Sequence, residues 1–212
     1  MRKINFAPMV KLGFTLALFA AAACVMLAFV YKGTEAKIAQ RKQADLEAAL
    51  RELFPGSDSF VPAGGIKSPD SSVAIESAYE ARKNGELTGV ALRLSRASYG
   101  GPIKIMAGVS VDGAITAVKI MEHSDTPGLG ANAASSSYFV DRAKKITFYG
   151  QFAGKKVTDP FEVKGDVAAV TASTITSRAV ALAVRAAGLG VTAWLAGVNV
   201  DAVSGASEGA AE

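Results

Sequence analysis

A run of twenty uncharged, mostly apolar residues lies between Lys11 and Lys32, and it limits the possible folds of this chain more than any other feature. At about 1.5 Å rise per residue, a helix of this length spans roughly 30 Å, the thickness of the hydrocarbon core of a bilayer. Arg2, Lys3 and Lys11 precede the run, as basic residues do in signal anchors. We therefore predict a tail and a retained transmembrane helix over residues 1–32.

Three other interpretations of this run compete with a retained anchor. A cleaved signal peptide has an apolar region of about 7–15 residues before its cleavage site, whereas this run continues through Val25–Tyr31. A lipoprotein would carry its lipid on Cys24, but apolar sequence follows where a polar linker is expected. A buried helix of a soluble protein is rarely apolar on every face. A retained span fits best, with Cys24 as a small apolar residue on it.

The charge distribution limits the kind of partner. The net charge of +4 comes from residues 1–32, because the other 19 basic residues are balanced by 19 acidic ones. A neutral body argues against a nucleic-acid-binding face. One Cys and one His argue against a disulfide scaffold, a cysteine-based metal site and a multi-histidine metal site. We expect contact with the lipid bilayer, no nucleic acid and no metal.

The first part of the body combines a helix with strands. An amphipathic helix is predicted over Glu35–Leu53 and ends at Phe54-Pro55-Gly56, so that residues 33–56 form a connecting helix. Ser57–Pro69 is loop-like. Strand patterns begin near Val73 and continue over the following ranges: Gly89–Leu94, Ile103–Val111 and Ala114–Ile120. The last two flank Asp112-Gly113, a strong hairpin turn.

The second part of the body is less regular. The predicted elements are an irregular loop over Ser124–Ala134, a short helix over Ser137–Lys145, short strands or turns over Phe148–Lys156 and Phe161–Val163, and a helix over Thr174–Ala187 with Gly188 as its stop. We assign one domain to residues 57–204 and a frayed tail to residues 205–212. The fold class is α+β: a single N-terminal transmembrane helix, then one domain with antiparallel strands and flanking helices.

Five hydroxyl side chains gather where the last predicted helix begins: Thr171, Ser173, Thr174, Thr176 and Ser177. A helix N-cap accounts for one of them and not for five. The free N–H groups and partial positive charge of a helix N-terminus bind anions. These hydroxyls therefore indicate a phosphate-related role, either binding a phosphate or, for one of them, being esterified to it.

Two glycine-containing turns are further candidates. After a predicted strand, His123 leads into Thr126-Pro127-Gly128-Leu129-Gly130, a tight turn that a flat ligand can approach. An ordinary loop with a hydrogen-bonded His123 is the alternative, and no nucleophile accompanies this histidine for a proton relay. Tyr99-Gly100-Gly101-Pro102 is, by itself, a turn.

Together these stretches resemble the FMN-binding domain of the G subunit of Rnf-type ion-translocating electron-transport complexes. That domain is related to the C subunit of sodium-pumping NADH:quinone oxidoreductases. Besides the anchor, the resemblance rests on four stretches: YGGPI at Tyr99–Ile103, the Asp112-Gly113 hairpin, EHSDTPGLG at Glu122–Gly130 and TITSRAV at Thr174–Val180. It implies a single-pass protein of the inner membrane, with a cytoplasmic N-terminus and a periplasmic FMN-binding domain.

The same resemblance implies a covalent cofactor. In that family FMN is bound through its phosphate to a Thr in a motif of the form Asp-x-x-Ser/Thr-Gly-Ala-Thr. Carried over, Thr174 is the acceptor and Thr171 is the first hydroxyl position. Here Ala172 and Ser173 replace the Gly and the Ala, so Ser173 is a competing acceptor. Ala168 stands where the Asp is expected, and Asp166 lies two residues earlier.

Further expectations follow from the resemblance. A separate flavin transferase attaches the FMN, and this chain carries no catalytic residue of its own. We expect Thr176 or Ser177 near the phosphate, the Thr126–Gly130 loop over the ring or ribityl chain with His123 nearby, and Tyr99 and Leu129 against the ring. The chain is then an electron carrier in a translocase that couples ferredoxin–NAD oxidoreduction to ion transport, and its partners are the other subunits of that complex. The alternative is a membrane-anchored extracytoplasmic binding or assembly module without covalent flavin.

Overall fold

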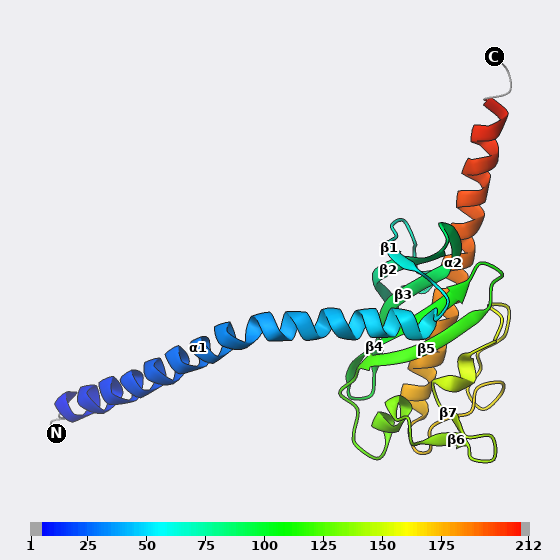
Figure 1. Ribbon diagram of the computed structural model, residues 1–212. Helices are drawn as coiled ribbons and strands as arrows, with labels where there is room; N and C mark the ends of the chain where they lie inside the picture. Colours follow the sequence, from blue (N-terminus) through cyan, green and yellow to red (C-terminus); the bar gives the residue numbers. More distant parts are fainter. Residues whose placement is uncertain (1–5, 209–212) are drawn as a thin grey trace. The chain divides into compact units, whose positions relative to one another are not determined.

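The computed structural model describes residues 6–208 and divides the chain into two compact units, residues 1–47 and 48–212. Helix α1 (Phe6–Leu53) accounts for the described part of the first unit and ends in the second (Figure 1). Its most apolar 18-residue window has a mean hydropathy of 2.3, and none of that window is buried. A helix that is apolar and exposed on every face has the properties of a membrane span. The predicted anchor is confirmed in this sense.

The second unit contains a five-stranded antiparallel sheet in which each strand pairs with the next one along the chain. The strands are β1 (Ser59–Pro62), β2 (Val73–Lys83), β3 (Glu86–Ser98), β4 (Gly101–Ser110) and β5 (Ile115–Glu122). The predicted hairpin is confirmed, since β4 and β5 flank Asp112-Gly113 and Gly113 has a positive φ of 74°. The predicted loop over 57–69 is wrong at β1, a four-residue edge strand too short to show an alternating pattern.

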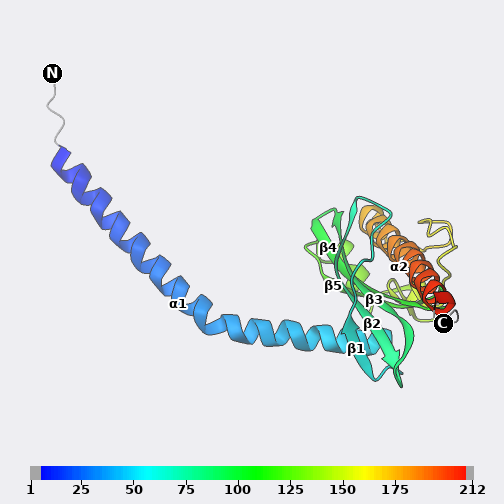
Figure 2. The same cartoon turned by 90° about the horizontal axis from the view of Figure 1, so that it is seen from above.

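Helix α2 (Thr174–Glu208) lies across one face of this sheet and contacts β2, β3 and β4 (Figure 2). Alanine and valine side chains on α2, such as Val180, Val184 and Ala187, pack against the apolar side chains of β3 and β4. The stretch Thr174–Gly197 is long and apolar enough to cross a membrane, but 56% of its most apolar 18-residue window is buried in the domain. It is therefore the core helix of this α+β fold, as the predicted fold class requires.

The opposite face of the sheet receives the carboxyl-terminal end of α1. Leu53 and Phe54 are buried there, and the Phe54 ring lies over two glycines of neighbouring strands. A Cβ atom on Gly89 would stand 2.6 Å from Phe54 Cε1, and one on Gly108 would stand 3.0 Å from Phe54 Cε2. Because Gly89 and Gly108 have no side chains, the Phe54 ring can pack directly against the backbone of the sheet.

The predicted stop of the last helix at Gly188 is wrong, because α2 continues to Glu208. Gly188 and Gly190 serve close packing instead. A Cβ on Gly188 would stand 2.6 Å from Val157 Cγ1, and one on Gly190 would stand 2.8 Å from the carbonyl oxygen of Lys67. Of the predicted frayed tail, residues 205–208 belong to α2 and residues 209–212 lie outside the described residues.

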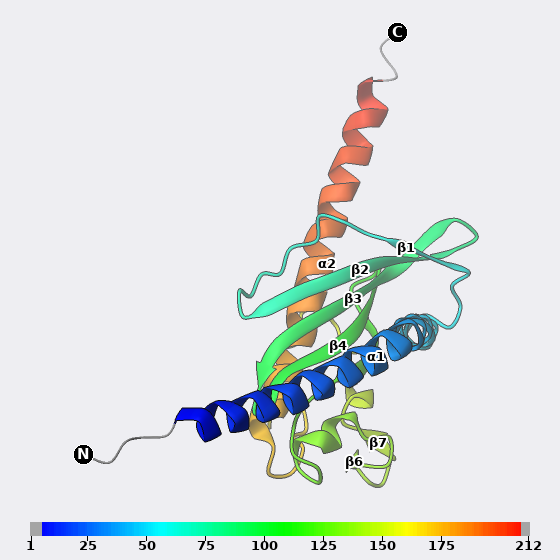
Figure 3. The same ribbon diagram turned by 90° about the vertical axis from the view of Figure 1, so that its left-hand side faces the viewer.

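The predicted helix over 137–145 is also wrong. The segment forms strand β6 (Phe139–Asp141), which pairs with β7 (Ile146–Thr147) beside the amino-terminal end of α2 (Figure 3). The Asp141 carboxylate accepts a hydrogen bond from the backbone N–H of Lys144 at 3.0 Å, and Lys145 has a positive φ of 53°. This turn chemistry ends the strand and excludes a helix.

The segments on either side of this ribbon consist of turns and short 3-10 helices. The loop after β5 ends in η1 (Gly130–Ala134), and η2 (Gly150–Phe152) follows β7. Phe148, Phe152 and Phe161 form an aromatic cluster, with Phe148 and Phe152 edge to face at 5.7 Å between ring centroids. These buried rings hold the irregular segment against the sheet and so position the chain that leads into α2.

Candidate functional site

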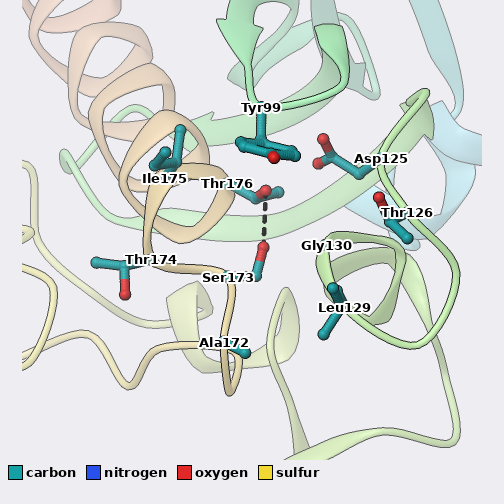
Figure 4. Close-up of a pocket in the computed structure, with 10 residues that line it drawn as sticks. All are labelled: Tyr99, Asp125, Thr126, Leu129, Gly130, Ala172, Ser173, Thr174, Ile175 and Thr176. Atoms are coloured by element: carbon teal, nitrogen blue, oxygen red, sulfur yellow. Dashed lines mark hydrogen bonds between the residues drawn. The ribbon is translucent and has the colours of Figure 1, made fainter.

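A cavity of about 490 Å³, the α2 cavity, opens where α2 begins. Three segments that are far apart in the sequence line it: the β3–β4 turn, the loop after β5, and the first turn of α2 with the residues before it (Figure 4). Its volume lies within the range of about 300–1,000 Å³ that is usual for small-molecule sites. The lining residues are Tyr99, Asp125, Thr126, Leu129, Gly130, Ala172, Ser173, Thr174, Ile175 and Thr176.

Seven of the residues expected at the flavin are brought together in this lining: Tyr99, Thr126, Leu129, Gly130, Ser173, Thr174 and Thr176. Four others, Thr171, Ser177, Gly128 and His123, are not part of the lining. Gly128 supplies the positive φ of 79° that the turn needs. His123 lines a separate hollow at the end of β5, together with Pro102 and Lys104.

The hydroxyls at the start of α2 differ in their environment. Ser173 and Thr176 are buried, and the Ser173 hydroxyl donates to Thr176 Oγ1 at 2.8 Å (Figure 4). Ser177 is also buried; its hydroxyl donates to the Ser173 carbonyl oxygen at 2.8 Å and accepts from the Val170 N–H at 3.0 Å. These bonds fix the entry of the chain into the helix.

Thr174 is different because its side chain is exposed, on the other side of Ser173 from Asp125 (Figure 4). Within residues 6–208 its hydroxyl makes no hydrogen bond. The first N–H groups of a helix have no partner within the helix, so the site also presents backbone donors and the positive end of the helix dipole. Thr174 is thus an accessible hydroxyl at an anion-binding position.

The residues before the helix are held in a strained turn. Ala172 has a positive φ of 58°, in the left-handed region that favours glycine. This is the position at which the family pattern has Gly. The neighbouring Thr171 is fixed by Tyr138, whose phenol donates to Thr171 Oγ1 and accepts from the Thr171 N–H, both at 3.1 Å. These two hydrogen bonds lower the pKa of the Tyr138 phenol, and the bond to the Thr171 side chain has the larger effect.

Asp125 has a role in the site that was not predicted from the sequence. Its buried carboxylate accepts a hydrogen bond from the Gly100 N–H at 2.7 Å and one from the Ser98 hydroxyl at 3.1 Å. Gly130 lies directly against it, since a Cβ there would stand 2.7 Å from Asp125 Cβ. Asp125 therefore ties the β3–β4 turn to the loop after β5, two of the three segments that line the cavity. An Asp that immediately precedes a Thr-Pro-Gly turn was the available signal.

Asp166 is engaged in its own loop and does not line the α2 cavity. Its carboxylate accepts from Lys155 Nζ at 3.0 Å and from the backbone N–H groups of Phe161 and Glu162. Burial alone raises the pKa of Asp166, but the hydrogen bonds from Lys155 and Glu162 outweigh it and the net pKa is lowered. At the position where the family pattern has Asp, the backbone of Ala168 is bonded to the Gln151 side chain.

The cavity combines hydroxyl side chains with an apolar rim. Tyr99, Leu129 and Ile175 line it although 74%, 44% and 58% of their surfaces are exposed. Exposed apolar side chains around a concave site are typical of ligand contacts. Among the described residues that line the cavity, Asp125 is the only carboxylate, and structural hydrogen bonds occupy it. Hydroxyls and N–H donors at the start of α2, together with apolar surfaces around the rim, fit a phosphate-bearing aromatic cofactor.

The chain also matches two protein families and several relatives by sequence. Residues 98–188 match the family described as FMN-binding domain, and residues 1–53 match that described as RnfG N-terminal region. The G subunit of the Na(+)-translocating ferredoxin:NAD(+) oxidoreductase complex of Acetobacterium woodii is 30% identical over 195 residues, covering 84% of this chain and 89% of the relative. The G subunit of the ion-translocating oxidoreductase complex of Cereibacter sphaeroides is 31% identical over 150 residues, covering 70% of this chain and 65% of the relative. The crystal structure of Shewanella oneidensis NqrC has 18% identity and a TM-score of 0.41, covering 63% of this chain and 66% of that one.

Proposed function

Because the chain belongs to the family of G subunits of Rnf-type ion-translocating oxidoreductase complexes, we propose that it carries electrons through FMN held covalently on Thr174. The coarser part of this statement follows from family membership: the chain is a membrane-anchored, FMN-binding electron-transfer subunit of a complex with several subunits. The attachment residue, the coupling to ferredoxin and NAD, and the side of the membrane are the parts we propose.

One observation carries the choice of Thr174: it is the exposed hydroxyl at the start of α2, while its two hydroxyl neighbours in the cavity are buried and bonded to each other. Attachment at Ser173 would require breaking its bond to Thr176 and turning the side chain out of the core. Burial also denies a transferase access to that oxygen. Thr174 needs neither change.

A separate flavin transferase would attach the cofactor by transferring the FMN group from FAD to the Thr174 hydroxyl. The Thr174 hydroxyl oxygen attacks the flavin-side phosphorus of FAD, and the new O–P bond forms as the pyrophosphate bond breaks. AMP leaves, and the hydroxyl proton passes to a base on the transferase. The N–H groups at the start of α2 stabilise the negative charge of the resulting phosphodiester.

The residues of the rim position the cofactor. When bound, FMN supplies the redox chemistry, and the protein supplies orientation and surroundings. Tyr99, Leu129 and Ile175 provide apolar surface for the isoalloxazine ring, and the Thr126–Gly130 loop forms one wall of the cavity. We assign His123 no contact with the cofactor, because it lines a different hollow.

Mass spectrometry of the full chain, co-expressed with a flavin transferase, tests the attachment. The wild-type chain should gain a mass equal to FMN less water on the peptide that contains Thr174, and Thr174→Ala should abolish the gain. Ser173→Ala and Thr171→Ala are the matched controls, and both should keep the modification. Modification that persists in Thr174→Ala would move the attachment to another hydroxyl and refute this proposal.

We place the N-terminus in the cytoplasm and the FMN domain in the periplasm. The flanking charges of the anchor are nearly balanced, since Arg2, Lys3 and Lys11 precede it and mixed basic and acidic residues follow it. The resemblance to Rnf-type G subunits therefore supports this orientation more than the flanking charges do. Fusing alkaline phosphatase after residue 208 should give an active enzyme, because that enzyme folds only outside the cytoplasm; an inactive, stable fusion would reverse the orientation.

A module without covalent flavin is the second candidate function. Two observations favour it. Ala168 stands at the position where the motif has Asp, and the nearby Asp166 carboxylate is hydrogen-bonded within its own loop. In-gel flavin fluorescence of the chain from its native membranes separates the two candidates. A fluorescent band supports the flavoprotein, and its absence supports a binding or assembly module.

A further inference from the structure

A second hollow of about 210 Å³ lies beside the α2 cavity, and we call it the arginine hollow. Its lining residues are Arg96, Ala97, Thr174, Ile175, Arg178 and Ala179. Thr174 and Ile175 line both spaces, so the first turn of α2 forms the partition between them. A group attached to Thr174 can therefore extend into either space.

The two guanidinium groups of the arginine hollow are not equivalent. Arg96 is partly neutralised, since its Nη1 lies 2.9 Å from Asp70 Oδ2 and also donates to the Ser72 hydroxyl. Arg178 is exposed, and within residues 6–208 its guanidinium makes no ion pair or hydrogen bond. Of these two arginines, Arg96 is therefore held in an ion pair, whereas the Arg178 guanidinium is available to an anion.

The helix geometry directs the Arg178 side chain toward Thr174. Residues four apart are neighbours on a helix surface, at roughly 5–6 Å between Cβ atoms. Helical side chains lean toward the amino-terminal end, so Arg178 leans toward the turn that contains Thr174. A guanidinium presents two parallel N–H donors that match two oxygens of a phosphate group.

From this arrangement we propose that Arg178 binds the two non-bridging oxygens of the phosphodiester on Thr174, in the arginine hollow. The α2 cavity, which shares Thr174 and Ile175 with the arginine hollow, would then be left to hold the flavin ring. The inference rests on the proposed attachment at Thr174. It adds a phosphate-binding residue that acts both on the incoming FAD phosphate and on the finished phosphodiester.

The first measurement is the rate at which the detergent-solubilised full chain gains FMN from FAD and a purified flavin transferase. Arg178→Gln should lower this rate about tenfold, the usual effect of losing a charge-assisted hydrogen bond. Arg178→Lys should give an intermediate rate, because it keeps the charge and loses the paired donors. Arg185→Gln is the matched control: it is an exposed arginine of the same helix that lines neither space, and it should react at the wild-type rate.

The second measurement is the ³¹P NMR spectrum of the flavinylated protein, which reports the phosphodiester itself. Its resonance should move toward that of a hydrated phosphodiester in Arg178→Gln and stay in place in Arg185→Gln; if Arg178→Gln gains no FMN, Arg178→Lys takes its place. An unchanged rate overturns the inference, and so does a slower rate with an unmoved resonance, since Arg178 would then act only on the transferase. A wild-type chain without FMN, or a Thr174→Ala chain that gains it, would instead overturn the attachment site.

Discussion

Ala172 offers a test of the backbone conformation that leads into the site. Its φ of 58° lies in the left-handed region, which costs a residue with a Cβ atom about 1 kcal/mol. Replacing it by Gly removes that cost but adds conformational freedom to the unfolded chain, which lowers stability by about 0.5 kcal/mol. The net expectation for Ala172→Gly is an increase of about 0.5 kcal/mol in the free energy of unfolding.

Urea denaturation of the full chain in detergent measures this change. The chain has one tryptophan, Trp194, which is partly buried against the domain core and reports its unfolding by fluorescence. With a slope of about 2 kcal/mol per molar urea, a gain of about 0.5 kcal/mol raises the midpoint by about 0.25 M. The flavinylation rate should not fall, because Gly fits the same turn.

Ala153 is the matched control, because it is exposed and its φ of −60° is ordinary for a residue with a side chain. Ala153→Gly should therefore lower the midpoint by about 0.25 M, since only the unfolded-state effect remains. The two alanine-to-glycine variants move in opposite directions. If both lower the midpoint equally, Ala172 is not strained and the reasoning is refuted.

Three further predictions concern packing, charge and the anchor. Gly130→Ala should lower the free energy of unfolding by about 1–3 kcal/mol in the same urea assay, because its Cβ would stand 2.7 Å from Asp125 Cβ. Asp166→Asn should cost about 1–2 kcal/mol at pH 7 through the lost bonds to Lys155 and the backbone. Folding lowers the pKa of Asp166. The difference in the free energy of unfolding between the wild-type chain and Asp166→Asn should therefore be fully present above about pH 4 and should shrink as the pH falls through the folded pKa. Removing residues 1–32 should move the protein from the membrane pellet to the soluble fraction after ultracentrifugation.

Each of these changes has a control. Gly56→Ala should be nearly neutral, because the nearest atom to its Cβ is Lys83 Nζ at 4.0 Å. Asp45→Asn removes an exposed carboxylate and should leave the free energy of unfolding at pH 7 unchanged. Removing residues 205–212 should leave the chain in the membrane pellet. A pH-independent loss in Asp166→Asn, or a truncated chain that still pellets, would contradict the corresponding prediction.

Features that depend on neighbouring residues could be predicted from the sequence. The apolar run after Lys11 needs only its length and lack of charge to be a membrane-spanning helix. Asp112-Gly113 produces a tight hairpin because its backbone preferences are local. The hydroxyls from Thr171 to Ser177 mark the start of a helix for the same reason.

Features that depend on distant residues could not be predicted in this way. A glycine such as Gly188 often ends a helix, but here it lies inside α2, where the absence of a side chain allows close packing against Val157 from another segment. Asp125 gains its role only when folding brings the Gly100 N–H to it.

The order of the residues was therefore enough to establish a membrane helix, an α+β domain and a cluster of hydroxyls at the start of a helix. Which of those hydroxyls is accessible became clear from the folded chain, because burial of Ser173 and Thr176 depends on the sheet and loops packed around them. The fold also brings Arg178 and Arg96, from a helix and a strand, into one hollow with Thr174. Local preferences act over a few residues, whereas exposure and charge in a site are set by segments that meet only when the chain folds.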